Sequence, residues 1–274
     1  MIEIVKALIY GVIEGITEWL PVSSTGHMIL AEKLLQFELS SQFISMFRVV
    51  IQLGAILAVV VLYWERLWPF CKGKSVADSV KKPTMVLWCK ILVASLPAAV
   101  LGLLLDDWMD EHLYNHIVVG LMLILYGVVF LLVEKKQRTP RVTALENIGY
   151  KDAFAVGVWQ VLALVPGTSR SGATIIGGLL LGMDRSTASQ FTFILAIPVM
   201  AGASGLKVLK FLLGDGVFTG GEVAVLAAGC LSAFVVSMAA IRFLMNYVKN
   251  HSFSLFGVYR IVLGIVVLAA AAMG

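Results

Sequence analysis

Apolar runs of about twenty residues recur along this chain, and they constrain its fold more than any other feature. Such runs are long enough to cross a bilayer core as helices, and they occupy residues 44–64, 85–105, 115–133, 190–212, 222–245 and 254–273. Of the 274 residues, 59% are hydrophobic and only 14% are charged, which is about half the charge of an average soluble domain. A soluble monomer could not bury that much apolar surface. The sequence therefore predicts an all-α polytopic membrane protein with six transmembrane helices in one integral membrane domain, residues 1–274.

Two further regions are apolar but broken. Residues 2–20 end at Pro21 and are followed by the short segment 22–37, while residues 152–165 end at Pro166 and are followed by the short segment 172–183. Proline ends or kinks a helix, and irregular backbone at membrane depth has to line a cavity. We expect each region to form a re-entrant helix pair that enters the membrane and returns to the same side.

The two broken regions belong to an internal repeat. The segment 20–26 (LPVSSTG) matches the segment 165–172 (VPGTSRSG), which divides the chain into halves of about 1–140 and 146–274. Each half holds one re-entrant pair and three spans, and an odd number of spans inverts the second half relative to the first. The sequence thus predicts an inverted-topology repeat whose two polar loops meet near the membrane midplane.

Loop charges predict the orientation. The connections 65–84, 134–152 and 242–251 are basic, whereas 106–114 is acidic and 213–221 carries only Asp215. Because cytoplasmic loops are enriched in Lys and Arg, we place the basic connections inside and both termini outside. This rule explains the net charge of +4, so no nucleic-acid partner is predicted, and the bilayer itself is the expected surroundings.

The first broken helix carries two carboxylates. Glu14 and Glu18 are four residues apart and share one helix face. Carboxylates at membrane depth are costly and are usually functional. Because like charges this close repel, either one of them is protonated or a cation lies between them. The alternative is a helix near the interface with both side chains solvated.

Polar residues follow each proline break. After Pro21 come Ser23, Ser24, Thr25, Gly26 and His27. After Pro166 come Gly167, Thr168, Ser169, Arg170, Ser171 and Gly172. Hydroxyls and glycine at a helix N-terminus form a cradle for anions, and the planar guanidinium of arginine suits phosphate oxygens. These residues predict a site for a multiply charged anion.

One assignment is open at this point, and two more expectations concern the other polar residues of the spans. Arg170 either binds an anion or pairs with Glu14 or Glu18. Gln52, about two turns into the span 44–64, is expected to line the cavity. The charged residues Lys90, Lys207, Lys210 and Arg260 are expected to extend to the membrane surface from helix ends.

The motifs resemble one family. Glu14-x-x-x-Glu18 and the segments 20–27, 50–54 and 166–172 are similar to the bacterial undecaprenyl-diphosphate phosphatases, the bacitracin-resistance proteins. The resemblance covers the whole chain in length, order and spacing.

The resemblance implies hydrolysis of undecaprenyl diphosphate to undecaprenyl phosphate and inorganic phosphate, which recycles a lipid carrier for cell-wall polymers. It implies a multi-pass protein of the bacterial plasma membrane whose site opens to the outer side. It also implies a divalent cation, Mg²⁺ or Ca²⁺, for which Glu14 and Glu18 are the candidate ligands. The catalytic residues carried over are Glu14, Glu18, Ser24, His27 and Arg170.

Several expectations stay open beside the resemblance. Arg48 stands where many relatives have an acidic residue, which puts the role of that acid in doubt here. Either Ser24 attacks phosphorus with His27 as its base, or His27 attacks directly. A homodimer is a candidate assembly, although no residue pattern in the sequence specifies the oligomeric state. The alternative function is a secondary transporter or flippase of an anion or lipid, because inverted repeats with broken helices are also transporter architecture.

Overall fold

The computed structural model describes residues 1–71, 80–136, 139–214 and 217–272, and parts of the predicted loops 65–84, 134–152 and 213–221 lie outside these ranges. The elements are helical: α1 (Ile2–Thr17), α2 (Ser24–Leu34), α3 (Ser41–Leu62), α4 (Trp64–Leu67), α5 (Lys82–Leu113), α6 (His116–Lys135), η1 (Leu145–Asn147), α7 (Tyr150–Val161), η2 (Leu162–Leu164), α8 (Arg170–Leu180), α9 (Arg185–Leu213), α10 (Gly220–Tyr247) and α11 (Ser254–Ala272).

The prediction of six spans is confirmed in number and place. Among the described residues, six helices are long and apolar enough to cross a membrane, and they are α3, the segment Lys82–Leu105 of α5, α6, α9, α10 and α11. The chain is therefore a multi-pass membrane protein. The short helices α1, α2, α7 and α8 lie outside this set.

One boundary prediction is wrong. The acidic segment 106–114 was expected to be a loop, but α5 continues through it to Leu113. No Gly or Pro lies between Leu103 and Leu113 to end the helix. The next helix begins where the Asn115 side chain accepts a hydrogen bond from the backbone N–H of Val118 at 2.9 Å.

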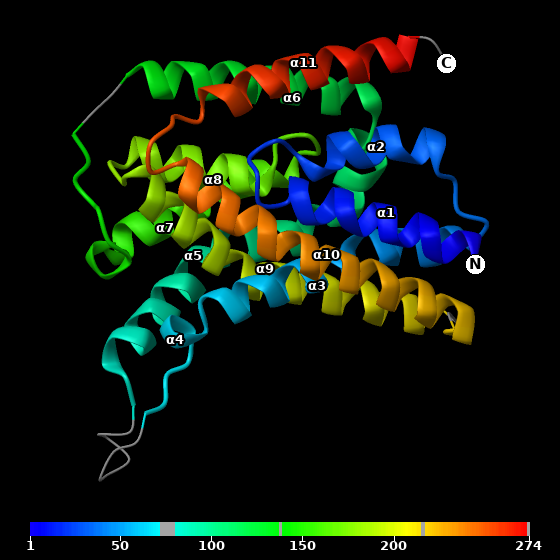
Figure 1. The fold of residues 1–274 in the computed structure, drawn as a ribbon, viewed down its shortest axis with the longest axis horizontal. Helices are drawn as coiled ribbons and strands as arrows, with labels where there is room; N and C mark the ends of the chain where they lie inside the picture. The colour runs from blue at the N-terminus through cyan, green and yellow to red at the C-terminus, as the bar shows by residue number, and fades with distance from the viewer. Residues whose placement is uncertain (72–79, 137–138, 215–216, 273–274) are drawn as a thin grey trace.

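The helices pack in pairs that are far apart in sequence. In Figure 1, α11 lies beside α6 along one edge of the molecule, and α1 lies beside α10. Glycines permit the first of these contacts: a Cβ on Gly264 would lie 2.7 Å from the carbonyl oxygen of Gly120, and a Cβ on Gly127 would lie 2.7 Å from that of Gly257. Small residues of this kind let membrane helices approach closely.

The core surrounds the two proline breaks. Trp19 and Val22 belong to the same buried cluster as Phe130, Ala173 and Phe193, so the segment that follows α1 shares a core with α6, α8 and α9. This packing brings the segments 18–24 and 167–172 together in the interior. The predicted polar loops therefore meet inside the helix bundle.

Candidate functional site

The two polar loops end in the same backbone conformation. Ser23 precedes α2 with φ 73°, and Ser169 precedes α8 with φ 67°, values that residues other than glycine rarely adopt. Each serine caps its helix: the Ser23 hydroxyl accepts from the N–H of Gly26 at 3.4 Å, and the Ser169 hydroxyl accepts from that of Gly172 at 3.2 Å. The caps leave the free N–H groups of two helix N-termini near each other in the interior.

Arg170 and Glu18 join the two loops. The Arg170 Nε and Nη2 donate to Glu18 Oε1 at 3.1 and 2.9 Å, and both side chains are about nine-tenths buried, with 11% and 8% of their surfaces exposed. The remaining terminal nitrogen, Nη1, donates to the carbonyl oxygen of Thr192 at 3.0 Å. Of the two alternatives for Arg170, the structure contains the pairing with Glu18.

Ser24 faces the same carboxylate. Its hydroxyl donates to Glu18 Oε2 at 3.2 Å, so one carboxylate contacts both a candidate nucleophile and a candidate anion-binding group. The Ser171 hydroxyl anchors the backbone here by donating to the carbonyl oxygen of Glu18 at 2.8 Å. A serine beside a proton acceptor and an arginine is an arrangement suited to phosphoryl transfer.

Glu14 lies one turn earlier on α1 and is 1% exposed. Its side chain hydrogen-bonds to Gln52 of α3, while its Oε1 has no hydrogen-bond partner among the described residues. Burial, followed by the charge of Glu18, raises the pKa of Glu14 well above its ordinary value. The side chain is therefore protonated or balanced by a cation.

The two hydrogen bonds described for the His27 ring go to residues other than Ser24. Its Nδ1 donates to the carbonyl oxygen of Ser23 at 2.8 Å, so in the neutral ring Nε2 accepts from the Tyr259 hydroxyl at 2.7 Å. Burial lowers the pKa of His27, and the charge of Arg260 adds to that effect. The ring is thus held as a neutral acceptor in a fixed tautomer, and the proton acceptor that contacts Ser24 is Glu18.

The other predicted residues of the two loops adjoin these contacts along the chain, and Gln52 contacts Glu14. Gly26, Gly167, Thr168, Ser171 and Gly172 are buried, and Thr25 and Gln52 are half-buried. Arg48 lies apart from this cluster and pairs with Glu32 of α2, with 2.7 Å between Arg48 Nε and Glu32 Oε1. Arg48 therefore fixes α2 to α3 and does not contact the carboxylate pair.

Three residues at the site were missed or misread from the sequence. Thr192 contributes a carbonyl oxygen, which no sequence pattern marks. Tyr259 and Arg260 lie inside the span 254–273. Arg260 is six residues from the start of this helix, and a cation inside a span is itself a signal of a functional position. The expectation that Arg260 reaches the membrane surface is wrong, because its side chain is completely buried.

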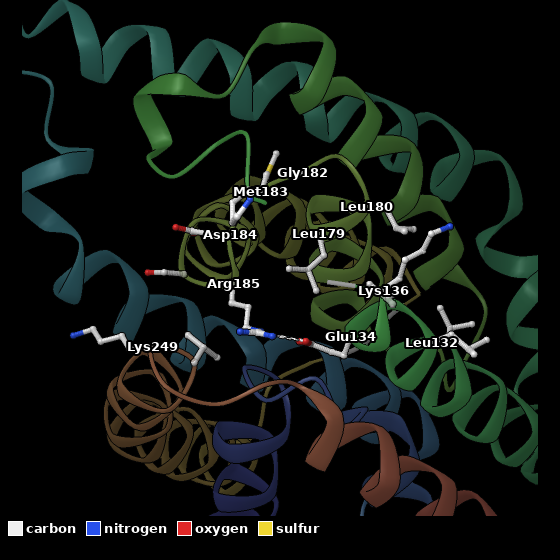
Figure 2. Close-up of a pocket in the computed structure, with 15 residues that line it drawn as sticks. Leu132, Glu134, Lys136, Leu179, Leu180, Gly182, Met183, Asp184, Arg185 and Lys249 are labelled. Atoms are coloured by element: carbon white, nitrogen blue, oxygen red, sulfur yellow. Dashed lines mark hydrogen bonds and ion pairs between the residues drawn. The ribbon is translucent and has the colours of Figure 1, made fainter. Parts of the chain in front are cut away.

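A separate cavity of about 770 Å³ lies at the far end of α8. Figure 2 shows the ion pair that crosses it, in which Arg185 Nη2 donates to Glu134 Oε2 at 2.6 Å, with Lys136 and Lys249 on opposite sides. None of the predicted site residues lines this cavity. The polar cluster around Glu18, and not this cavity, is the candidate active site.

Comparison with known proteins gives consistent matches over nearly the whole chain. Residues 7–266 match the family model described as bacitracin resistance protein BacA. The undecaprenyl-diphosphatase of Streptococcus thermophilus is 53% identical over 270 residues, covering 98% of this chain and 93% of that protein. The undecaprenyl-diphosphatases of Streptococcus mutans and Enterococcus faecalis are 54% and 52% identical, covering 97% and 96% of this chain and 95% of each relative.

Proposed function

The chain belongs to the bacitracin resistance protein BacA family, and we propose from this premise how its site works as an undecaprenyl-diphosphatase. The enzyme hydrolyses undecaprenyl diphosphate to undecaprenyl phosphate and inorganic phosphate. This reaction returns the lipid carrier to cell-wall synthesis and confers bacitracin resistance, because bacitracin binds the diphosphate form. The observation that supports the assignment within this chain is the contact of one buried carboxylate, Glu18, with both Ser24 and Arg170.

Ser24 is the nucleophile in the proposed mechanism. Its oxygen attacks the terminal phosphorus, its proton passes to Glu18 Oε2, and the bond between that phosphorus and the bridging oxygen breaks. Undecaprenyl phosphate leaves as an anion and needs no proton. Water then attacks the phosphorus of the phosphoserine. As the bond between phosphorus and Ser24 Oγ breaks, Glu18 returns its proton to Oγ and takes one from the attacking water, and inorganic phosphate leaves with Ser24 restored.

Arg170 and the helix N-termini hold the substrate. The guanidinium exchanges its bond to Glu18 for bonds to phosphate oxygens, and the free N–H groups at the starts of α2 and α8 face the same anion. His27 is held by hydrogen bonds to Ser23 and Tyr259. In the proposed mechanism its neutral ring gives no proton to the leaving group and lines the site. The isoprenyl chain lies in the membrane between the spans.

We further propose a divalent cation, Mg²⁺ or Ca²⁺, at the carboxylates. The donor set fits, since Glu14 Oε1 is buried with no hydrogen-bond partner in the described part of the chain, and hard cations prefer carboxylate and amide oxygens. Glu14, Glu18 and the amide oxygen of Gln52 would hold the ion. When bound, the cation supplies positive charge that offsets the negative charge of the diphosphate.

An inverted repeat with two re-entrant pairs is proposed for the architecture. The short helices α2 and α8 begin 146 residues apart, have the same length of 11 residues, and follow serines of matching φ. The pairing of α1 with α10 has a counterpart in the pairing of α7 with α5. In Figure 1 the start of α1 and the labelled end of α11 lie toward one end of the molecule and α4 lies toward the other, which supports the proposal that the connection 65–84 and the ends of the chain are on opposite sides of the membrane.

The proposed orientation places the site toward the outer side of a bacterial plasma membrane. In a variant without native cysteines, we expect Lys136→Cys to be protected from an impermeant thiol reagent in intact cells, and Glu38→Cys to react. The reason is the excess of Lys and Arg on cytoplasmic connections. Labelling of Lys136→Cys from outside would contradict the inverted topology. Light scattering of the same protein, purified in detergent, tests for a homodimer.

The activity itself is tested by phosphate release from the purified protein. A C55 or C15 isoprenyl diphosphate should yield one inorganic phosphate per substrate, and a chelator should suppress the rate until Mg²⁺ or Ca²⁺ is restored. Movement of the lipid across vesicles without phosphate release would favour the alternative, a transporter or flippase. An undiminished rate in excess chelator would remove the cation from the proposal.

Replacing Arg170 by lysine tests the anion clamp. Lysine keeps the charge but loses the planar fork that pairs with two oxygens. We expect kcat/KM to fall at least about tenfold, which corresponds to about 1.4 kcal/mol of transition-state stabilisation. The control is Arg66→Lys, in an exposed ion pair with Glu146. Wild-type turnover in Arg170→Lys would mean that Arg170 only pairs structurally with Glu18.

A further inference from the structure

Arg260 is a buried cation that the proposed mechanism does not use. It lies six residues after the start of α11, and none of its surface is exposed. No carboxylate lies within ion-pair distance of it among the described residues, and its Nε has no hydrogen-bond partner there. Burying a charge without a counter-ion is costly, so the position calls for an explanation.

The hydrogen bonds of Arg260 go to the backbone of both polar loops. Nη1 donates to the carbonyl oxygen of Pro21 at 3.3 Å. Nη2 donates to the carbonyl oxygens of Gly167 and Thr168 at 2.9 and 2.8 Å. One side chain from a third helix thereby holds the segments that precede α2 and α8 at a fixed separation.

These bonds also orient the loop peptides. In a planar trans peptide the N–H points opposite to the carbonyl. Because the Thr168 carbonyl points at Arg260, the N–H of Ser169 points away from it. The guanidinium therefore sets the direction of a donor at the start of α8, the helix that carries Arg170.

The charge of Arg260 lies close behind the site. A Cβ on Gly172, in the first turn of α8, would lie 3.1 Å from Arg260 Nη1, and the Tyr126 ring lies on another side, with its centroid 5.7 Å from Arg260 Cζ. The same charge contributes to lowering the pKa of His27. A multiply charged anion at the two N-termini would supply the negative charge that Arg260 lacks.

We propose that Arg260 is a positioning residue for the diphosphate, which fixes the two helix N-termini relative to each other and supplies positive charge behind them. This inference deepens the proposed function and rests on it. Arg260 acts through the loop backbone and its field, without contact to the reacting atoms. Its loss should therefore weaken anion binding more than it slows chemistry.

Two substitutions separate this role from simple folding support. Arg260→Gln keeps hydrogen-bond donors without charge, and Arg260→Lys keeps charge with fewer oriented donors. With a C15 isoprenyl diphosphate we expect KM to rise about tenfold or more in Arg260→Gln, with a smaller fall in kcat and an intermediate KM in Arg260→Lys. The control is Arg185→Gln, which removes a partly buried guanidinium at the far end of α8 and should leave KM unchanged.

Binding of inorganic pyrophosphate, measured by calorimetry, gives an independent readout that does not require turnover. We expect the dissociation constant to rise about tenfold in Arg260→Gln and not in Arg185→Gln. If wild-type protein binds pyrophosphate in this way but releases no phosphate from the lipid, the proposed function fails while the role of Arg260 stands. A folded Arg260→Gln protein with wild-type KM and wild-type pyrophosphate affinity would overturn the inference. If Arg260→Gln does not fold, the same unchanged values in Arg260→Lys would overturn it.

Discussion

Ser24→Ala is expected to abolish phosphate release, lowering kcat by about a thousandfold or more, or roughly 4 kcal/mol. The hydroxyl is the nucleophile in the proposed mechanism and donates to Glu18 Oε2 at 3.2 Å. Alanine cannot form the phosphoenzyme, while the helix N-terminus that is proposed to bind the anion remains. The measurement is single-turnover phosphate release with a C15 isoprenyl diphosphate. The control is Ser232→Ala, which removes a hydroxyl that donates to the carbonyl oxygen of Leu8 away from the site.

The competing nucleophile is His27. If it attacked phosphorus directly, Ser24→Ala would keep measurable turnover and His27→Gln would have none. We expect the reverse, with a slow residual rate in His27→Gln, because the described contacts of His27 go to Ser23 and Tyr259. A phosphoenzyme trapped on His27, stable to base and labile to acid, would reverse this assignment.

Glu18→Gln is expected to lower kcat by about a hundredfold or more, because the amide cannot take the proton of Ser24. It also leaves the buried guanidinium of Arg170 without a carboxylate, so a fall in thermal stability should accompany the loss of activity. Phosphate release and a thermal melt in detergent measure the two effects. Glu32→Gln is the matched control, since it breaks the ion pair with Arg48 outside the site.

The two effects of Glu18→Gln can be separated. In the double variant Glu18→Gln with Arg170→Gln the unpaired charge is gone, so the melting temperature should recover while turnover stays low. Because Arg170 is the proposed anion clamp, recovery of turnover together with stability would contradict the roles proposed for both Glu18 and Arg170. That outcome would return the role of proton acceptor to His27.

The sequence predicted the spans and the breaks because both depend on local properties. A run of apolar residues specifies a spanning helix wherever it packs, and Pro21 and Pro166 prevent a helix from continuing through them whatever lies nearby. The end of α5 was missed for a related reason. Charge indicates where a chain leaves the membrane, but only a stop signal ends the helix, and the segment after Leu105 lacks one.

The site was predicted as a set of residues but not as a set of contacts. Proximity of Glu14, Glu18 and Ser24 followed from their spacing, and Arg170 was among the candidates through the repeated motif. The hydrogen bonds of Gln52 to Glu14 and of Tyr259 to His27 join residues far apart in sequence. Arg260 was misread because its distance from the helix end says nothing about whether it faces lipid or the interior.

The close approach of α6 and α11 limits how the molecule can move. Both helices contact α2, and α6 also contacts α8, so the two helices that begin at the site rest on one shared support. The backbones of the support meet at Gly120 and Gly264, and at Gly127 and Gly257, with no room for a side chain between them. In transporters with inverted repeats, alternating access works by rocking one repeat against the other. With the repeat proposed above, that motion would have to pull these backbones apart. A pair of helices in close contact along its length favours a site that keeps its shape through each turnover over one that opens first to one side of the membrane and then to the other.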